Sequence, residues 1–165
     1  MGLPTHVLLV HGAVVLVPLL AVGAVLYALV PKLRPRLTWV VLLLAVVAPL
    51  AALFTKLSGD AFFAALQDFD PPRIGGELLE QAQQHQQYGT ITAWITGALG
   101  LVALLMIYLV DRTWPSWAPS SPGTRRGILL GLTAVTVALA LADGYYIFQT
   151  GDSGARMAWD QLLSE

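Results

Sequence analysis

Four long runs of hydrophobic residues, separated by shorter polar segments, dominate the pattern of the chain. The runs predict helices over residues 5–30, 37–57, 88–110 and 127–148. Each run holds the roughly 20 apolar residues that an α-helix needs to cross the hydrocarbon core of a bilayer. The first run has no Asp, Glu, Lys or Arg between Gly2 and Val30, and Pro31 ends it. The pattern therefore predicts an all-α integral membrane protein built as a four-helix bundle.

The segment between the second and third runs, residues 58–87, is the most polar connection. Residues 60–67 have the pattern of a short amphipathic helix, Pro71 and Pro72 interrupt it, and residues 77–87 continue as a polar helical stretch. We therefore expect an outer loop that is partly helical. No repeat with a period of 20 to 50 residues, the range typical of repeat proteins, is visible. Residues 1–165 are accordingly predicted to form a single transmembrane domain.

The basic residues are distributed unevenly between the connections. The first and third connections carry six Lys or Arg residues and one acidic residue, whereas the remaining polar positions carry three basic and nine acidic residues. Cytoplasmic loops of membrane proteins are enriched in Lys and Arg. Both termini and the loop 58–87 are therefore predicted to lie on the outer side of the membrane.

Composition narrows the function classes further. Hydrophobic residues make up 56% of the chain and charged residues 12%, against about 25% charged residues in a typical soluble domain. The formal net charge of −1 offers no basic surface to phosphates, so the predicted partner is the lipid bilayer and not a nucleic acid. The chain has no cysteine, which excludes iron–sulfur clusters, thiolate metal sites and haem attached through cysteines.

The three histidines are candidate cofactor-binding residues, because ionisable groups in or near membrane spans often indicate function. Counted along ideal helices, His6 and His85 lie at the predicted outer headgroup level and His11 lies deeper. His6 and His11 are about 140 degrees apart around a helix, so a ligand pair from two helices is favoured. The alternatives are water contact for His6 and His85, and a hydrogen bond to a neighbouring helix for His11.

Lys56 and Asp143 are the charged residues within the predicted spans. Their estimated heights differ by roughly 5 Å, which predicts an intramembrane ion pair. With such a pair, Asp143→Asn would destabilise the fold and Lys56→Met would partly rescue it. The alternatives are a Lys56 side chain that extends alone to the interface, and an ion or proton relay. No motif places a nucleophile beside a base, so no catalytic residue is predicted and an enzyme is disfavoured.

Small residues recur at every third or fourth position of the last run. They are Gly127, Gly131, Ala134, Ala138 and Ala142. Membrane helices associate through close packing of small residues. We expect this seam to pack within the bundle, with a homodimer face as the alternative.

Several motifs resemble those of an uncharacterised bacterial family of four-helix membrane proteins, the domain of unknown function numbered two-two-three-one. They are His6-Val-Leu-Leu-Val-His11-Gly, Thr55-Lys-Leu-Ser-Gly-Asp60, His85 at the start of the third run, and residues 150–159 after the fourth. The resemblance implies four membrane helices in a bacterial plasma membrane. Family members fused to Rieske or cytochrome domains imply a role near respiratory electron transfer.

These observations together favour a small membrane protein of redox electron transfer that binds haem b near the outer leaflet through two of its histidines, with a metal ion as a less favoured ligand. Imidazoles on facing helices of a bundle are a common way to hold haem. Its expected protein partners are redox proteins of the same membrane, and no separate metal site is predicted. The alternative is a non-catalytic structural or accessory subunit. Ion or proton transport is a third possibility, disfavoured because the chain shows no inverted repeat.

Overall fold

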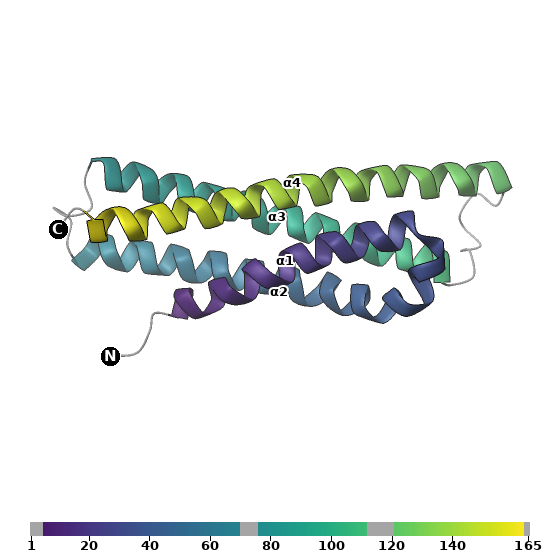
Figure 1. The fold of residues 1–165 in the computed structure, drawn as a ribbon, viewed down its shortest axis with the longest axis horizontal. Coiled ribbons are helices and arrows are strands. Elements are labelled where there is room, and N and C mark those ends of the chain that lie inside the picture. Colours follow the sequence, from purple (N-terminus) through teal and green to yellow (C-terminus); the bar gives the residue numbers. More distant parts are fainter. Residues whose placement is uncertain (1–4, 70–75, 112–120, 164–165) are drawn as a thin grey trace.

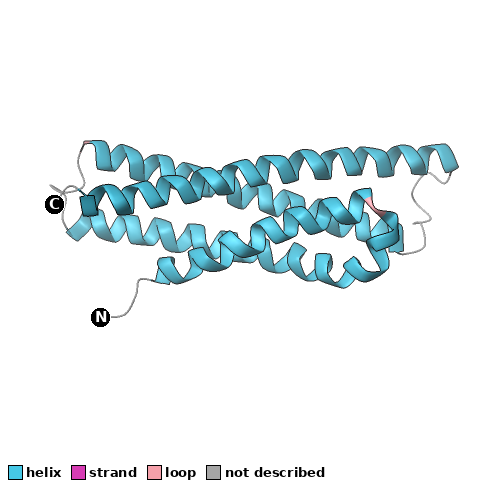
Figure 2. Ribbon diagram, viewed as in Figure 1, coloured by secondary structure: helices cyan, strands magenta, loops and turns pink. Residues whose placement is uncertain are grey.

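The computed structural model describes residues 5–69, 76–111 and 121–163, and these residues are almost entirely helical. Helix α1 spans Thr5–Leu29, α2 spans Arg34–Phe69, α3 spans Glu77–Asp111 and α4 spans Pro122–Leu163, with a short 3-10 turn, η1, at Pro31–Leu33 (Figures 1 and 2). No strand occurs among the described residues. All four helices contain a segment long and apolar enough to cross a membrane. The predicted all-α four-helix membrane fold is confirmed.

The helices form an antiparallel ring in which each helix packs against its neighbours in the chain and α4 also packs against α1. Helices α1 and α3 lie on one diagonal of the ring; α2 and α4 lie on the other and share no contact among the described residues. The starts of α1 and α3 and the ends of α2 and α4 lie at one end of the bundle (Figure 1). We call it the histidine end, because His6 and His85 belong to it.

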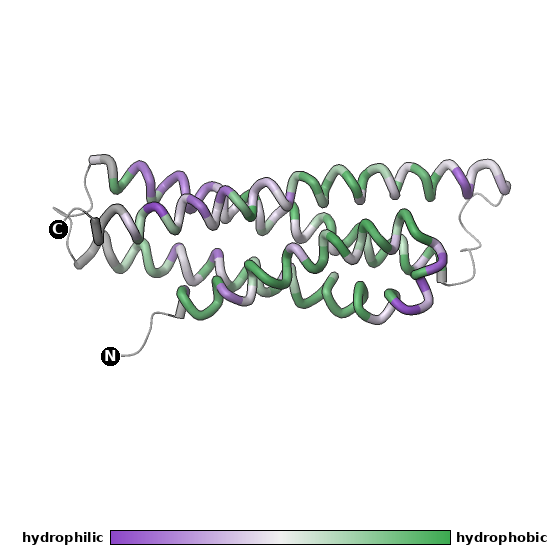
Figure 3. Tube along the Cα trace, viewed as in Figure 1, coloured by the Kyte–Doolittle hydropathy of each residue, from purple (hydrophilic) through white to green (hydrophobic). Residues whose placement is uncertain are grey.

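The helices are longer than a membrane span requires. Helices α2, α3 and α4 have 36, 35 and 42 residues, whereas about 20 residues cross the hydrocarbon core. Helix α2 runs past residue 57 to Phe69 and α3 starts at Glu77, so most of the expected loop 58–87 is helix. The extra turns are polar at the histidine end of α3 and α4 (Figure 3). The four apolar runs each fall on one helix, and helices α2, α3 and α4 extend beyond the predicted spans.

The opposite end of the bundle is tightly packed and holds the first two helices in a fixed hairpin. Arg34, after η1, donates to the carbonyls of Tyr27 at 3.0 Å and Ala28 at 3.1 Å, so it caps the end of α1. The core next to this turn includes Tyr27, Val41 and Met106, each at most 1% exposed. The cavity described below lies at the other end of the bundle, the histidine end.

Helices α2 and α3 approach most closely at Pro49 and Gly100. Proline has no N–H, so Pro49 leaves the carbonyl of Ala45 without its usual helical donor. A Cβ atom on Gly100 would lie 2.6 Å from that carbonyl oxygen, so glycine is required for the observed approach.

The predicted small-residue seam of α4 does not pack within the bundle, so that expectation is wrong. Gly127, Gly131, Ala134 and Ala138 are exposed, and a Cβ on either glycine would meet nothing within 4 Å. Helix α4 instead buries the face with Thr136, Ala140 and Asp143. Spacing alone identified a periodic stripe, but which face of α4 meets the bundle depends on the neighbouring helices.

Candidate functional site

A cavity of about 700 Å³ lies among the four helices at the histidine end. Its wall is largely apolar and includes both His6 of α1 and His85 of α3. Because α1 and α3 lie on a diagonal of the bundle, the two histidines reach the cavity from opposite sides.

His6 is held by α2 through one ring nitrogen. Its Nδ1 lies 3.1 Å from the carbonyl oxygen of Thr55 and 3.1 Å from Oγ of Ser58. The Ser58 hydroxyl donates its single hydrogen to the same Thr55 carbonyl at 2.9 Å. Both groups can therefore accept a hydrogen from Nδ1, which favours the tautomer with hydrogen on Nδ1 and a lone pair on Nε2.

His85 is held by α4 in the same way. Its Nδ1 lies 3.0 Å from Oγ of Ser153, and the Thr150 backbone also hydrogen-bonds to the ring. The Ser153 hydroxyl donates to the Thr150 carbonyl at 3.1 Å. The network repeats that of His6 partner for partner, and it again leaves Nε2 with the lone pair.

A glycine follows each serine and makes room for the imidazole. A Cβ atom on Gly59 would come within 2.9 Å of the His6 ring, and one on Gly154 within 3.0 Å of the His85 ring. Each histidine ring therefore lies directly against the backbone of the partner helix. The shared motif is Thr-x-x-Ser-Gly, at residues 55–59 and 150–154.

The repetition extends to other residues of the cavity wall. In both α1 and α3, the residues one and seven positions after the histidine line the cavity. In both α2 and α4, the lining residues stand three positions before the motif threonine and four, seven and eight positions after it. These residues are Val7, Ala13, Ala52, Gly59, Phe62 and Phe63 in the first hairpin and Gln86, Thr92, Ile147, Gly154, Met157 and Ala158 in the second. The cavity is thus built by two copies of one helical hairpin.

Sequence reasoning missed this repeat and its serines and glycines. The two histidines are 79 residues apart and the two motif threonines are 95 residues apart. Both separations exceed the period of about 20 to 50 residues that is typical of repeat proteins. Only the polar and glycine positions recur, because the lining positions are filled by different apolar side chains. The signal available in the sequence was the Thr-x-x-Ser-Gly motif, present once after each hairpin's second apolar run.

His11 lies outside the site. It is exposed, and its Nδ1 lies 2.7 Å from the carbonyl oxygen of Val7 on the same helix. Of the three candidate histidines, the structure brings together His6 and His85, one from each hairpin. The pair comes from two helices, as the angle between His6 and His11 indicated.

Lys56 and Asp60 form an ion pair on the cavity wall, and Asp60 also accepts a hydrogen bond from Gln86 of α3 at 2.8 Å. The predicted pair between Lys56 and Asp143 is therefore corrected. Helix α2 continues through residue 60, which places Asp60 one turn from Lys56, whereas Asp143 belongs to the diagonal helix α4. Asp143 instead accepts a hydrogen bond from Thr96 at 2.9 Å.

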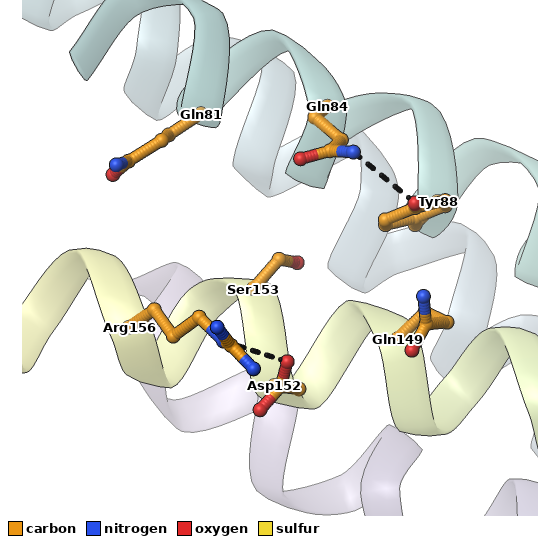
Figure 4. Close-up of a pocket in the computed structure, with 7 residues that line it drawn as sticks. All are labelled: Gln81, Gln84, Tyr88, Gln149, Asp152, Ser153 and Arg156. Atoms are coloured by element: carbon orange, nitrogen blue, oxygen red, sulfur yellow. Dashed lines mark hydrogen bonds and ion pairs between the residues drawn. The ribbon is translucent and has the colours of Figure 1, made fainter. Parts of the chain in front are cut away.

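A second, polar pocket of about 380 Å³ adjoins the first between α3 and α4 (Figure 4). Gln84 donates to the Tyr88 hydroxyl at 3.2 Å, and Arg156 donates to Asp152 at 2.8 Å. Ser153 lines this pocket while its hydroxyl contacts His85, so one serine separates the polar pocket from the imidazole. The outer flank of His85 is therefore polar.

The donor set restricts the kind of ligand that the cavity fits. Among the described residues, no group of three or more His, Asp or Glu side chains could hold a metal ion. Protein zinc sites use three or four protein ligands, whereas haem iron receives four from the porphyrin and takes its axial ligands from the protein. The cavity volume lies within the range of small-molecule sites, about 300 to 1,000 Å³. Two imidazoles that line one apolar cavity are the donor set that haem iron commonly takes from a protein.

Comparison with known proteins gives the family. No curated protein and no solved structure matches the chain. The family model described as Predicted membrane protein (DUF2231) matches residues 2–164, nearly the whole length. The chain therefore belongs to the DUF2231 family of membrane proteins.

Proposed function

We propose that this protein is a small membrane electron-transfer protein that binds haem b between His6 and His85. One observation carries the proposal: two imidazoles on diagonal helices line one apolar cavity, and each is held through Nδ1 so that Nε2 is left for a ligand. Histidines that ligate metals almost always donate their other N–H to a backbone carbonyl, carboxylate or water.

The protein residues around the cavity suit this role. The backbones of Thr55 and Thr150 hydrogen-bond to the two rings and fix the orientation of each imidazole. Lys56 is the only Lys or Arg among the described residues that line the cavity, and it is suited to pair with a propionate carboxylate. Haem in this cavity would be held by His6 and His85 and would supply one-electron chemistry. The arrangement favours electron transfer over chemistry on a bound substrate.

The position of the cavity suggests where a redox partner would approach. The site lies at the histidine end, which the charge distribution predicts to face outward from a bacterial plasma membrane. A redox protein of that membrane, or one at its outer surface, would reach the haem from this end. The family resemblance to chains that carry cytochrome or Rieske domains supports the same class of partner.

Absorption spectroscopy tests the proposal. We expect protein purified from haem-supplied cells to show a Soret band and sharp bands on reduction, at about one haem per chain. His6→Ala and His85→Ala should each lose or strongly shift these bands. His11→Ala is the matched control, because His11 is a histidine of the same helix as His6 but lies outside the cavity.

A colourless wild-type protein under adequate haem supply would reject haem binding and favour the accessory-subunit alternative. Loss of the haem bands in His11→Ala to the same extent as in His6→Ala and His85→Ala would also contradict the proposal, because it would indicate a different pair of ligands.

A further inference from the structure

Asp143 places a carboxyl group in the membrane-spanning interior of the bundle. It lies on α4, is 0% exposed, and accepts a hydrogen bond from Thr96 of α3, which is also 0% exposed. Within the described chain, its second oxygen, Oδ2, has no hydrogen-bond partner. A buried ionised carboxylate needs a charge partner or several donors, and Asp143 has only one hydroxyl.

Among the described residues, no cation is placed to balance a charge on Asp143. Helices α1 and α3, which pack against α4, have no Lys or Arg. Their titratable side chains are those of His6, His11, Tyr27, Glu77, Glu80, His85, Tyr88, Tyr108 and Asp111. On α4 itself the nearest basic residue is Arg156, roughly 20 Å along the helix, and Tyr145 and Tyr146 are the nearest titratable side chains. The ion pair of Lys56 is with Asp60 on the diagonal helix.

The hydrogen bonds of Thr96 indicate that Asp143 carries a proton. The Thr96 hydroxyl lies 2.8 Å from the carbonyl oxygen of Thr92 and 2.9 Å from Oδ1 of Asp143. A hydroxyl has one hydrogen, and both of these groups are acceptors if Asp143 is ionised. If Asp143 is protonated, it donates to Thr96 and Thr96 donates to Thr92, so each contact has its own hydrogen.

The carboxyl lies close below the cavity. Thr92, one helical turn from Thr96, lines the cavity and contacts the hydroxyl of Thr150 at 3.2 Å. The distance from the level of His85 to that of Thr96 is about 16 Å along α3. At this range and an effective dielectric constant near 20, a unit charge changes the proton affinity of a carboxyl on the order of tenfold.

We propose that Asp143 is a proton-binding site coupled to the redox state of the cavity, a role that rests on the proposed haem function. An oxidised cofactor in the cavity would lower the proton affinity of Asp143 and a reduced one would restore it, so reduction by a one-electron donor shifts Asp143 from the carboxylate toward the acid, with the proton taken from water. This proton uptake offsets part of the added charge, which limits the cost of placing an electron in a medium of low dielectric constant. Oxidation releases the proton.

Infrared difference spectroscopy of the haem-loaded protein tests this coupling. Reduction should produce the C=O stretch of a protonated carboxylic acid, shifted in heavy water. The band should be lost in Asp143→Asn, whose amide donates to Thr96 as the neutral acid does and so preserves the fold. Glu80→Gln removes an exposed carboxylate of α3 that lines neither pocket and should leave the band unchanged. The midpoint potential of Asp143→Asn should depend less on pH than that of wild type.

Two outcomes overturn the proposal. In haem-loaded protein, a difference spectrum without a carboxylic acid band, or one with a band that persists in Asp143→Asn, excludes Asp143 as the coupled site. If the protein binds no haem, the proposed function fails on its own. The difference between the infrared spectra of haem-free wild type and haem-free Asp143→Asn then still tests whether Asp143 binds a proton. A carboxylic acid band at neutral pH then supports proton binding at Asp143, and its absence rejects it.

Discussion

The two imidazoles of the cavity are held in place by small residues of the facing helices. Ser58 and Ser153 orient the rings, and Gly59 and Gly154 let the rings lie against the backbone. The sequence indicated His6 and His85 because ionisable residues near membrane spans are uncommon. It did not indicate the serines and glycines, because these residues are common in membrane helices. Their role is visible only when the histidine of the facing helix is in place.

Gly59→Ala and Gly154→Ala test whether these glycines make room for the imidazoles. Each added methyl group would overlap the adjacent imidazole, displace it and break its Nδ1 hydrogen bond. Changes in such supporting contacts typically lower metal affinity by about 10- to 100-fold. We expect a loss of that size in haem affinity, measured by titration of haem into the haem-free protein.

Gly151→Ala is the control for both substitutions. A Cβ at Gly151 meets nothing within 4 Å, so haem affinity should be unchanged and helix stability should rise by up to about 1 kcal/mol. Equal haem affinity in all three variants would show that the glycines do not make room for ligating imidazoles.

The Lys56 and Asp143 prediction failed at the residue scale for a topological reason. Helix rise placed the two side chains at similar heights, but height does not say which helices are neighbours. Since α2 and α4 are diagonal, Lys56 pairs within its own helix and Asp143 bonds to α3. Asp143→Asn should consequently be tolerated, and Lys56→Met should not alter its effect on the free energy of unfolding.

At the scale of elements, hydropathy predicted the four helices and their order, because an apolar run of this length has few other structures available to it in lipid. It could not predict where the helices end, because the polar turns at the histidine end continue each helix without an apolar face. It also selected the wrong small-residue contact. The close approach involves Gly100 of α3 and the carbonyl of Ala45, which Pro49 leaves free on α2.

Gly100→Ala should destabilise the bundle. The new methyl group would lie 2.6 Å from the Ala45 carbonyl oxygen and 3.0 Å from the Pro49 ring, and the backbone oxygen has little freedom to move. Overpacking of this kind typically costs about 1 to 3 kcal/mol. The free energy of unfolding in mixed detergent micelles measures the effect.

Gly97→Ala provides the matched comparison on the same helix, since a Cβ there meets nothing within 4 Å. We expect it to be neutral or stabilising by up to about 1 kcal/mol. Similar destabilisation by both substitutions would indicate that α2 and α3 do not meet as described.

For the whole molecule, two hairpins of one pattern surround the cavity, and each contributes one histidine and one Thr-x-x-Ser-Gly motif. Such parallel repeats in membrane proteins are related by an axis along the membrane normal. The arrangement places both histidines at the same depth by symmetry. The repeat escaped detection because the two hairpins share few residue identities, whereas the three-dimensional positions of their lining residues coincide.

The orientation of the molecule can be measured directly, because the chain has no cysteine. A cysteine added after Glu165 should react with a membrane-impermeant thiol reagent in intact cells, since the acidic histidine end is predicted to face outward. Ser121→Cys, in the basic connection at the other end, should react only after the membrane is opened. The reverse labelling pattern would place the haem site on the inner side.

We propose that His6 and His85 together ligate one haem. Electron paramagnetic resonance of the oxidised protein is the most direct test of this pair, because the spin state of ferric haem depends on both protein ligands. We predict the low-spin signal of a haem with two imidazole ligands in wild type and in His11→Ala, and its loss in both His6→Ala and His85→Ala. A high-spin signal in wild type, or a low-spin signal that survives in His85→Ala, would contradict the account.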